Sequence, residues 1–167
     1  VASVQTPGTP HDIDALSEVV FVADGDAGVG IYNTYNGMPP ARIGQIDVLG
    51  SDVVEVTVAQ DTLLVREDRN FIVGYDISDP ANPTYLWIRD TNANHIANAG
   101  TVGYEANSST LRTFDVRTGQ IVDERSYGFN TIVAMEARSE ALYFLTSGFN
   151  NSQLSKIETG GALGDPV

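Results

Sequence analysis

Short apolar stretches alternate with turn residues along the whole chain, in a pattern that repeats about every 40 residues. The large apolar residues Tyr32, Tyr75, Phe114 and Ile157 mark the repeat and lie 43, 39 and 43 residues apart. Each is followed by a polar or acidic residue and then by a turn rich in Gly, Pro, Asn or Asp. No segment has a convincing 3.6-residue apolar period, so the pattern predicts strands and very few helices.

Each repeat contains four short β-rich stretches joined by turn signals such as Asp24-Gly25 and Thr118-Gly119. The first stretches are residues 12–16, 54–58, 95–98 and 131–135, and the second are residues 19–23, 62–66, 101–105 and 141–145. The third surround the large apolar residues, and the fourth are residues 41–47, 84–89 and 120–125. The repeats are therefore predicted at about residues 10–47, 52–89, 94–125 and 130–159.

Four strands in a unit of about 40 residues are typical of a β-propeller blade. We expect an all-β fold, a β-propeller of about four four-stranded antiparallel blades in a single domain or propeller segment covering residues 1–167. A β-sandwich would explain the strands but not the repeat. Two arrangements stay open, namely a small closed ring and a part of a larger or oligomeric propeller. The apolar pattern predicts packing between sheets for Ile13, Phe21, Leu64, Tyr75, Phe114 and Phe144.

The pattern at the two ends of the chain predicts how the last blade is completed. The fourth repeat loses its strand pattern after the third strand, whereas residues 1–8 align with residues 42–50, an outer strand. Residues 1–6 are therefore predicted to be a closing strand for the last blade, because an open end would expose unpaired strand edges.

The residues of the second repeat resemble the LVIVD repeat of bacterial and archaeal surface propellers. Residues 71–83 (FIVGYDISDPANP) show a hydrophobic strand, an acidic residue and an Asp-Pro-Ala-Asn-Pro-type turn, and residues 22–29 are similar to the preceding strand and hairpin. Residues 117–119 and 158–160 replace the proline turn with Thr-Gly. The resemblance implies blade architecture without a catalytic signature, and an extracellular or cell-surface location.

Charge and composition narrow the range of partners. The chain has nine Lys and Arg against 22 Asp and Glu, a formal net charge of −13, so no basic stripe is available for nucleic acid. It has no cysteine, which excludes disulfides and thiolate metal sites. No apolar run approaches the roughly 20 residues that span a bilayer, so no membrane span is expected.

The loops that precede the first strands are the predicted ligand site, because propellers usually bind ligands at the channel mouth formed there. The candidate ligand-binding residues are His11, Asp12, Asp52, Asn94, His95 and Asn130. Both histidines of the chain fall at this position, and His11 with His95 could hold a divalent transition metal. The alternative is a mouth that holds only ordered water.

Other motifs have structural explanations. Residues 24–28 (DGDAG) resemble a calcium loop but fit a hairpin turn better. Asn107 and Asn150 fit the glycosylation sequon, and Trp87 is expected to pack between blades. Serine-nucleophile, phosphate-loop and zinc-protease motifs are absent from the sequence.

These observations favour a non-catalytic binding or assembly domain of a secreted or cell-surface protein. Its partner would be a protein or a surface polymer, and a homo-oligomer is one possible assembly. The alternative function is a metal-dependent propeller enzyme, a hydrolase or an oxidoreductase, with a channel-mouth site built from His11 and His95. No cofactor is specified beyond that possible divalent metal.

Overall fold

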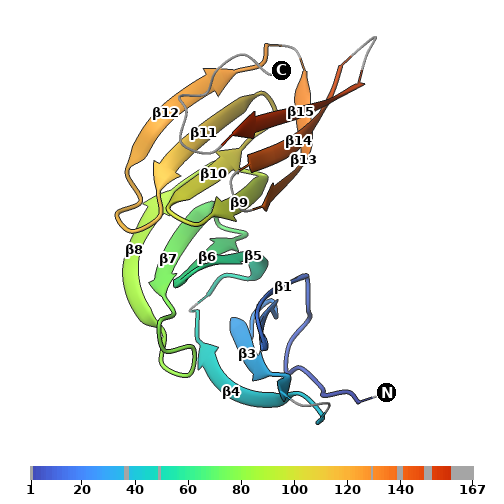
Figure 1. The fold of residues 1–167 in the computed structure, drawn as a ribbon, viewed down its shortest axis with the longest axis vertical. Helices are drawn as coiled ribbons and strands as arrows, with labels where there is room; N and C mark the ends of the chain where they lie inside the picture. Colours follow the sequence, from blue (N-terminus) through green and yellow to red (C-terminus); the bar gives the residue numbers. More distant parts are fainter. Residues whose placement is uncertain are drawn as a thin grey trace. The chain divides into compact units, whose positions relative to one another are not determined.

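The computed structural model describes residues 2–35, 38–48, 50–128, 130–138, 141–148 and 152–158. These residues form fifteen β-strands in four antiparallel sheets, and none of them lies in an α-helix (Figure 1). Three sheets have four strands, and the fourth has three strands among the described residues. The prediction of an all-β chain with four repeated sheets is confirmed.

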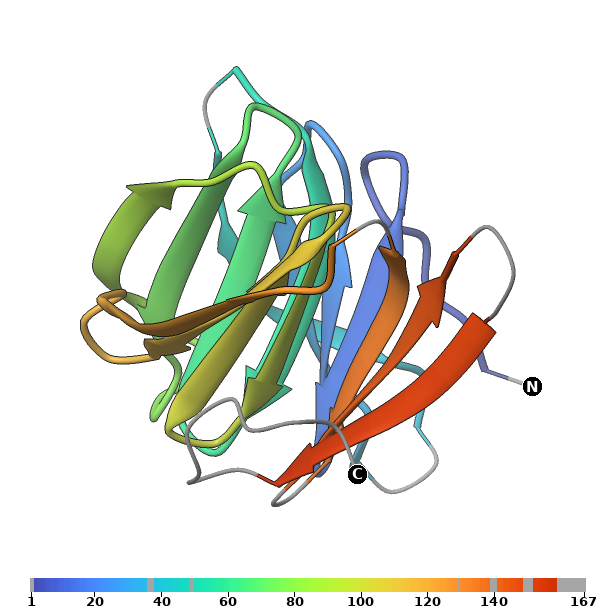
Figure 2. The same ribbon diagram turned by 90° about the horizontal axis from the view of Figure 1, so that it is seen from above.

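Within each sheet the strands pair in chain order, so each sheet is a simple meander (Figure 2). The first sheet contains β1 (Asp12–Leu16), β2 (Val19–Ala23), β3 (Val29–Asn33) and β4 (Ala41–Ile46). The second contains β5 (Val53–Ala59), β6 (Thr62–Glu67), β7 (Phe71–Asp76) and β8 (Thr84–Asp90). The third contains β9 (His95–Ala99), β10 (Val102–Ala106), β11 (Thr110–Asp115) and β12 (Ile121–Ser126), and the fourth contains β13 (Thr131–Arg138), β14 (Ala141–Ser147) and β15 (Ser152–Glu158).

The chain divides into two compact units, Val1–Thr91 and Asn92–Val167. The first unit holds the first and second sheets, and the second unit holds the third and fourth. The boundary falls between the second and third predicted repeats, where β8 ends and the loop before β9 begins.

The hairpins between the first and second strands of the sheets give a common register. Ser17, Gln60 and Gly100 each follow the first strand and have φ values of 56°, 54° and 80°. This left-handed conformation suits a two-residue hairpin between antiparallel strands. In the first sheet the two strand residues next to the hairpin, Leu16 and Val19, pair with each other. Equivalent positions in different sheets are found by counting residues from this pair along each strand.

In the first unit, β1 and β2 lie against β5 and enclose a core that includes Phe21, Ile31 and Val65. Two carboxylates strengthen this junction, because Asp12 Oδ2 accepts a hydrogen bond from Val56 N at 3.0 Å and Asp14 Oδ2 accepts one from Val58 N at 2.7 Å. We call the face that the first or third sheet turns to the next sheet of its unit its forward face, and the opposite face its rear face. In the second and fourth sheets, the face turned to the preceding sheet is the rear face, and the opposite face is the forward face. Asp12 and Asp14 therefore lie on the forward face of the first sheet.

Ile13 points to the rear face of the first sheet, because successive side chains alternate along a strand. It is 65% exposed, so the prediction that it packs between sheets is wrong. Its neighbours on this face are Val20, Val22 and Tyr32. The other predicted core residues are buried, except Tyr75, which is half-buried.

In the second unit, β9 of the third sheet lies against β13 and β14 of the fourth. Tyr104, Ile132, Leu142 and Phe144 form the buried core of this unit together with smaller residues. Alternation then places Tyr143, Leu145 and Leu154 on the forward face of the fourth sheet, where all three are exposed.

Residues 2–6 are not part of a β-strand. Ser3, Val4 and Thr6 instead line a groove on the rear face of the first sheet. The closing-strand arrangement of residues 1–6 stays a prediction. Residues 159–167 and Asn150, the second sequon, lie outside the described part of the chain.

Candidate functional site

The six predicted site residues all lie just before, or at the start of, the first strand of a sheet. Two of these loops make the same backbone bond to the end of the second strand: His11 N donates to Ala23 O at 2.8 Å, and Asn94 N donates to Ala106 O at 2.7 Å. Asp68 N donates to Asp52 O at 2.9 Å, and Asn130 N donates to Tyr127 O at 3.3 Å. The loops of the first and third sheets are therefore held alike, whereas Asp52 accepts a bond and Asn130 bonds within its own loop.

The structure gives these side chains different surroundings. The His11 imidazole is exposed and lies beside Gly25, whereas the Asp12 carboxylate is occupied by Val56 N. His95, at the start of β9, is half-buried. Asp12 thus has a structural role that sequence reasoning did not assign to it.

A recurring contact stabilises these loops, and sequence reasoning missed it. The residue that directly follows the second strand reaches back to the loop: Asp24 Oδ2 accepts from Gly8 N at 2.8 Å, and Asp68 Oδ1 accepts from Asp52 N at 3.0 Å. In the third sheet Asn107 Nδ2 donates to Asn92 Oδ1 at 3.2 Å. The available signal was an Asp or Asn directly after the second strand in three repeats.

The predicted site residues are divided between the two units. His11, Asp12 and Asp52 belong to the first, and Asn94, His95 and Asn130 belong to the second. Convergence of the six on one mouth, and a metal shared by His11 and His95, stay predictions. Among the described residues, no group of three or more His, Cys, Asp or Glu side chains is placed to hold a metal ion.

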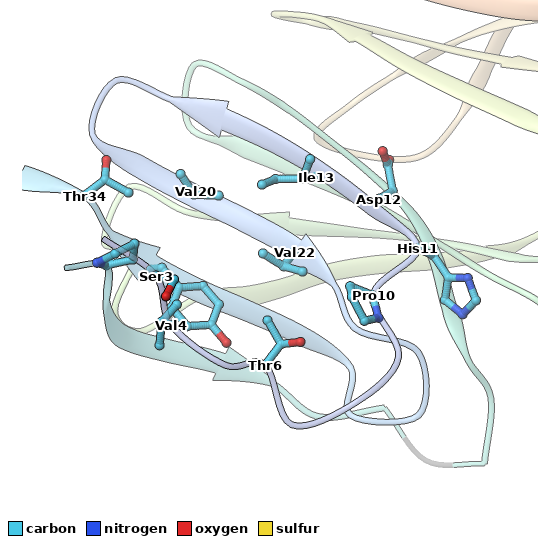
Figure 3. A pocket seen from close by; sticks show the side chains of 12 residues that line it. Ser3, Val4, Thr6, Pro10, His11, Asp12, Ile13, Val20, Val22 and Thr34 are labelled. Atoms are coloured by element: carbon cyan, nitrogen blue, oxygen red, sulfur yellow. The ribbon is translucent and has the colours of Figure 1, made fainter. Parts of the chain in front are cut away.

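A groove lies on the rear face of the first sheet (Figure 3). Its volume is about 570 Å³, within the range of ligand sites. Its lining is mostly apolar and comes from Val4, Pro10, Ile13, Val20, Val22, Tyr32 and Pro40, with Ser3, Thr6 and Thr34 among the polar residues. Figure 3 shows His11 at the edge of the groove, with its ring directed away from Val20 and Val22.

The Tyr32 hydroxyl is a polar group within this apolar surface. Tyr32 is buried, and its hydroxyl oxygen has no hydrogen-bond partner. The ring lies over Gly30, where a Cβ atom would come within 2.7 Å of Tyr32 Cε2. A buried hydroxyl without a partner costs stability, so a bound group that supplies one would be favoured here.

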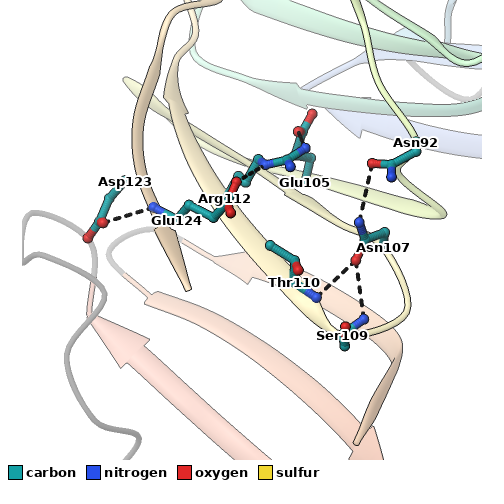
Figure 4. A network of polar contacts seen from close by, with 8 residues as sticks. All are labelled: Asn92, Glu105, Asn107, Ser109, Thr110, Arg112, Asp123 and Glu124. Carbon is teal, nitrogen blue, oxygen red and sulfur yellow. Dashed lines mark hydrogen bonds and ion pairs between the residues drawn. The ribbon is translucent and has the colours of Figure 1, made fainter. Parts of the chain in front are cut away.

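A second polar feature lies on the third sheet (Figure 4). Glu105 is buried and pairs with Arg112 Nη1 at 3.2 Å, while Arg112 Nε also contacts Glu124. The hydrogen bond to Glu124, with that to Glu105, raises the pKa of Arg112. Since a buried carboxylate needs a charged partner and Glu105 has one in Arg112, this network does not form an open acid–base site.

The perturbed tyrosines also have structural causes. Burial, with smaller contributions from Glu67 and Tyr85, raises the pKa of Tyr75 to about 12. Burial likewise raises the pKa of Tyr104. Both shifts move the phenol away from neutral pH, so neither tyrosine is prepared to act as a base there.

Comparison with solved structures identifies the fold. The chain superimposes on the computationally designed Ika4 protein with a TM-score of 0.70 at 10% identity, over 96% of this chain and 98% of that one. It also matches a chain of the Mitotic Checkpoint Complex (TM-score 0.69, 16% identity) over 98% of this chain and 51% of that one. BamB from Moraxella catarrhalis matches with a TM-score of 0.67 at 15% identity, over 94% of this chain and 49% of that one.

The chain is a four-bladed β-propeller. It spans nearly the full length of the designed protein but only about half of the other two chains. No family model and no curated protein matches the sequence, so the resemblance to the LVIVD repeat is not confirmed. In the described part of the propeller, no helix is long and apolar enough to cross a membrane.

Proposed function

We propose that this propeller is a non-catalytic module for binding and assembly in a secreted or cell-surface protein. One observation carries the proposal. Ile13 and Val56 hold the same position, three residues before the end of the first strand, yet Ile13 is 65% exposed and Val56 is 3% exposed. In the second sheet this position packs against the first sheet, so on the first sheet an apolar packing position is left uncovered.

Uncovered packing positions of this kind favour association with another protein surface. Single exposed apolar residues are common, but a contiguous apolar face with a groove is typical of an interaction site. The rear face of the first sheet offers such a face, and the forward face of the fourth sheet offers a second one. The Mitotic Checkpoint Complex match shows that a chain with this fold occurs in a protein assembly, which supports the proposal.

The location outside the cell rests on sequence features. The chain is acidic, lacks cysteine and contains the LVIVD-like residues 71–83. An acidic surface keeps a module with apolar faces soluble while it is unpartnered.

The proposal is tested with the fluorescent apolar dye ANS on dilute, folded protein. Ile13→Ser and Leu154→Ser should each lower the dye fluorescence, because each removes an exposed apolar side chain from one of the two faces. Val122→Ser is the matched control, since Val122 is 72% exposed, close to the 65% of Ile13 and Leu154, and belongs to β12 of the third sheet, which is part of neither face. Circular dichroism should show the same fold for all variants.

Dye fluorescence that depends on Val122 as much as on Ile13 and Leu154 would contradict the proposal. So would a folded protein that fails to bind the dye at any concentration.

A further inference from the structure

Each unit contains the same kind of junction, in which the forward face of one sheet packs on the rear face of the next. In the first unit Phe21 and Ala23 of β2 pack toward Val56 of β5. In the second unit Tyr104 and Ala106 of β10 share a core with Phe144 of the fourth sheet. A junction in this protein therefore needs one forward face and one rear face.

The forward face of the fourth sheet has the residues of a junction but no cover within its unit. Counted from the hairpin, Phe21 and Ala23 lie two and four residues after Val19, and Tyr143 and Leu145 lie two and four residues after Ala141. Phe21 and Ala23 are fully buried, whereas Tyr143 is 38% and Leu145 43% exposed.

The neighbouring strand shows the same difference. Val29 pairs with Ala23 and is fully buried, whereas Leu154 pairs with Leu145 and is 65% exposed. The fourth sheet thus presents a junction face of three exposed apolar side chains.

A carboxylate lies at the matching position on this face. Asp14 lies two residues before the end of β1, and its carboxylate accepts a hydrogen bond from Val58 N of the second sheet. Glu136 lies two residues before the end of β13 and is exposed. The backbone position that corresponds to Val58 on the first sheet is Ala15, one residue before the strand end. Ala15 N donates to Asp14 Oδ1 at 2.7 Å, so Glu136 of a docked fourth sheet would have to take the place of that acceptor in order to bond as Asp14 does with Val58 N.

The rear face of the first sheet is the complementary half. Ile13 is exposed where Val56 of the second sheet is buried, and the groove beside it is lined by Val20 and Val22. Within its own unit, neither the forward face of the fourth sheet nor the rear face of the first sheet is covered by another sheet.

We infer that two copies of this chain associate head to tail, with the fourth sheet of each copy docked on the first sheet of the other. The inference rests on the proposed function and names its partner. A second copy would supply the missing half of each junction, so two equivalent junctions would form between the copies. The chain length is consistent with a dimer, because one copy spans 51% of the checkpoint-complex chain and 49% of BamB, about half of each. Two copies would together contain eight sheets.

The test is sedimentation velocity of the full chain at protein concentrations between about 0.1 and about 100 μM. This range brackets a dimer dissociation constant in the micromolar range. The unmodified chain should sediment as a dimer at the upper end. Leu145→Asp and Ile13→Asp should each raise the dimer dissociation constant at least about tenfold, because each places a charge in an apolar junction. Val122→Asp, on β12, should leave it unchanged.

Mixing the two variants tests the head-to-tail geometry. The Ile13→Asp copy keeps an intact fourth sheet and the Leu145→Asp copy keeps an intact first sheet, so one junction can still form between them. The mixture should therefore recover dimer that neither variant forms alone. An interface between two fourth sheets would instead leave Ile13→Asp dimeric and would overturn the inference.

A chain that stays monomeric at all concentrations would also overturn it, as would a dimer insensitive to both substitutions. If the chain is monomeric but ANS detects both faces, the binding module stands and only the second copy is rejected. If ANS also fails to detect the faces, both proposals fall. A monomer whose melting temperature falls in both variants would mean that the two faces meet within one chain, which also rejects the second copy.

Discussion

Two glycines in the central strands make room for aromatic rings. A Cβ atom on Gly103 would lie 2.3 Å from the Phe114 ring, and one on Gly74 would lie 2.5 Å from Trp87 Cε2. Cross-strand pairing sets up both contacts, since Gly103 pairs with Phe114 and Gly74 with Trp87. The rings can therefore lie flat on the backbone and stay buried.

Gly103→Ala should lower the free energy of unfolding by about 2 kcal/mol, because the added methyl group overpacks the site. Urea unfolding measures the change. Phe114→Leu should partly relieve it in the double variant, since the smaller side chain leaves space for the methyl group. Additive losses in the double variant would mean that the ring is not the obstacle.

Tyr75 gives a pH dependence with a defined sign. Its pKa is about 12 in the folded protein, against 10.0 for an ordinary tyrosine, chiefly because of burial. A raised pKa stabilises the folded state below pH 10, and this contribution is lost as the pH rises through 12. The unmodified chain should therefore lose more stability than Tyr75→Phe between these limits, with a difference of about 2 kcal/mol at most.

Melting temperatures of the two proteins across this pH range provide the measurement. Parallel curves would show that Tyr75 ionises as easily in the folded chain as in the unfolded one.

Ile13 shows what the sequence could and could not predict for single residues. Alternation along residues 12–16 correctly separates two faces of the strand. It does not say which face another sheet covers, because that depends on residues far away in sequence. The burial of Phe21, Leu64, Phe114 and Phe144 was predictable because the repeat places these large apolar residues within the strands of each sheet.

Strands of the first unit are joined by carboxylates as well as by apolar packing. Asp12 and Asp14 of β1 accept hydrogen bonds from alternate backbone N–H groups of β5. β5 pairs with β6 along its other edge, so the carboxylates satisfy donors that no strand covers. Charged acceptors make such bonds stronger than neutral ones.

Asp14→Ala should lower the free energy of unfolding by about 1 to 2 kcal/mol, because Val58 N loses its acceptor in a partly buried place. Hydrogen exchange at the Val58 amide should accelerate, and urea unfolding should measure the loss. Asp90→Ala is a suitable control, since Asp90 is an exposed carboxylate at the end of β8. Equal losses in both variants would assign the effect to charge alone.

Strand positions were well predicted, and the contacts between strands were not. The second strands at residues 19–23 and 141–145 match β2 and the start of β14, because hairpin signals and alternation are local. The bonds of Asp12 and Asp14 join residues 44 positions apart. Nothing in the local pattern distinguishes these carboxylates from the site residues that the loop position suggested.

The whole molecule combines a net charge of −13 with uncovered apolar faces on its first and fourth sheets. Ser3, Val4 and Thr6 line the groove on the first sheet, so the N-terminal segment shields part of that face. Deleting residues 1–6 should therefore increase ANS fluorescence and lower the melting temperature.

Ser3→Ala, which keeps the segment, should change neither quantity. A deletion that leaves both the dye signal and the melting temperature unaltered would show that the segment is not seated on the first sheet.

The bonds from Asp12 and Asp14 have a consequence for the behaviour of the protein at high concentration. An exposed strand edge is a template on which strands of other chains can add, and growth of that kind leads to fibrils. The carboxylates of Asp12 and Asp14 occupy two N–H groups of β5, those of Val56 and Val58, but offer no backbone to extend the ladder. The edge of the second sheet at β5 thus carries groups that block templated growth. The apolar rear face of the first sheet stays free for a specific partner.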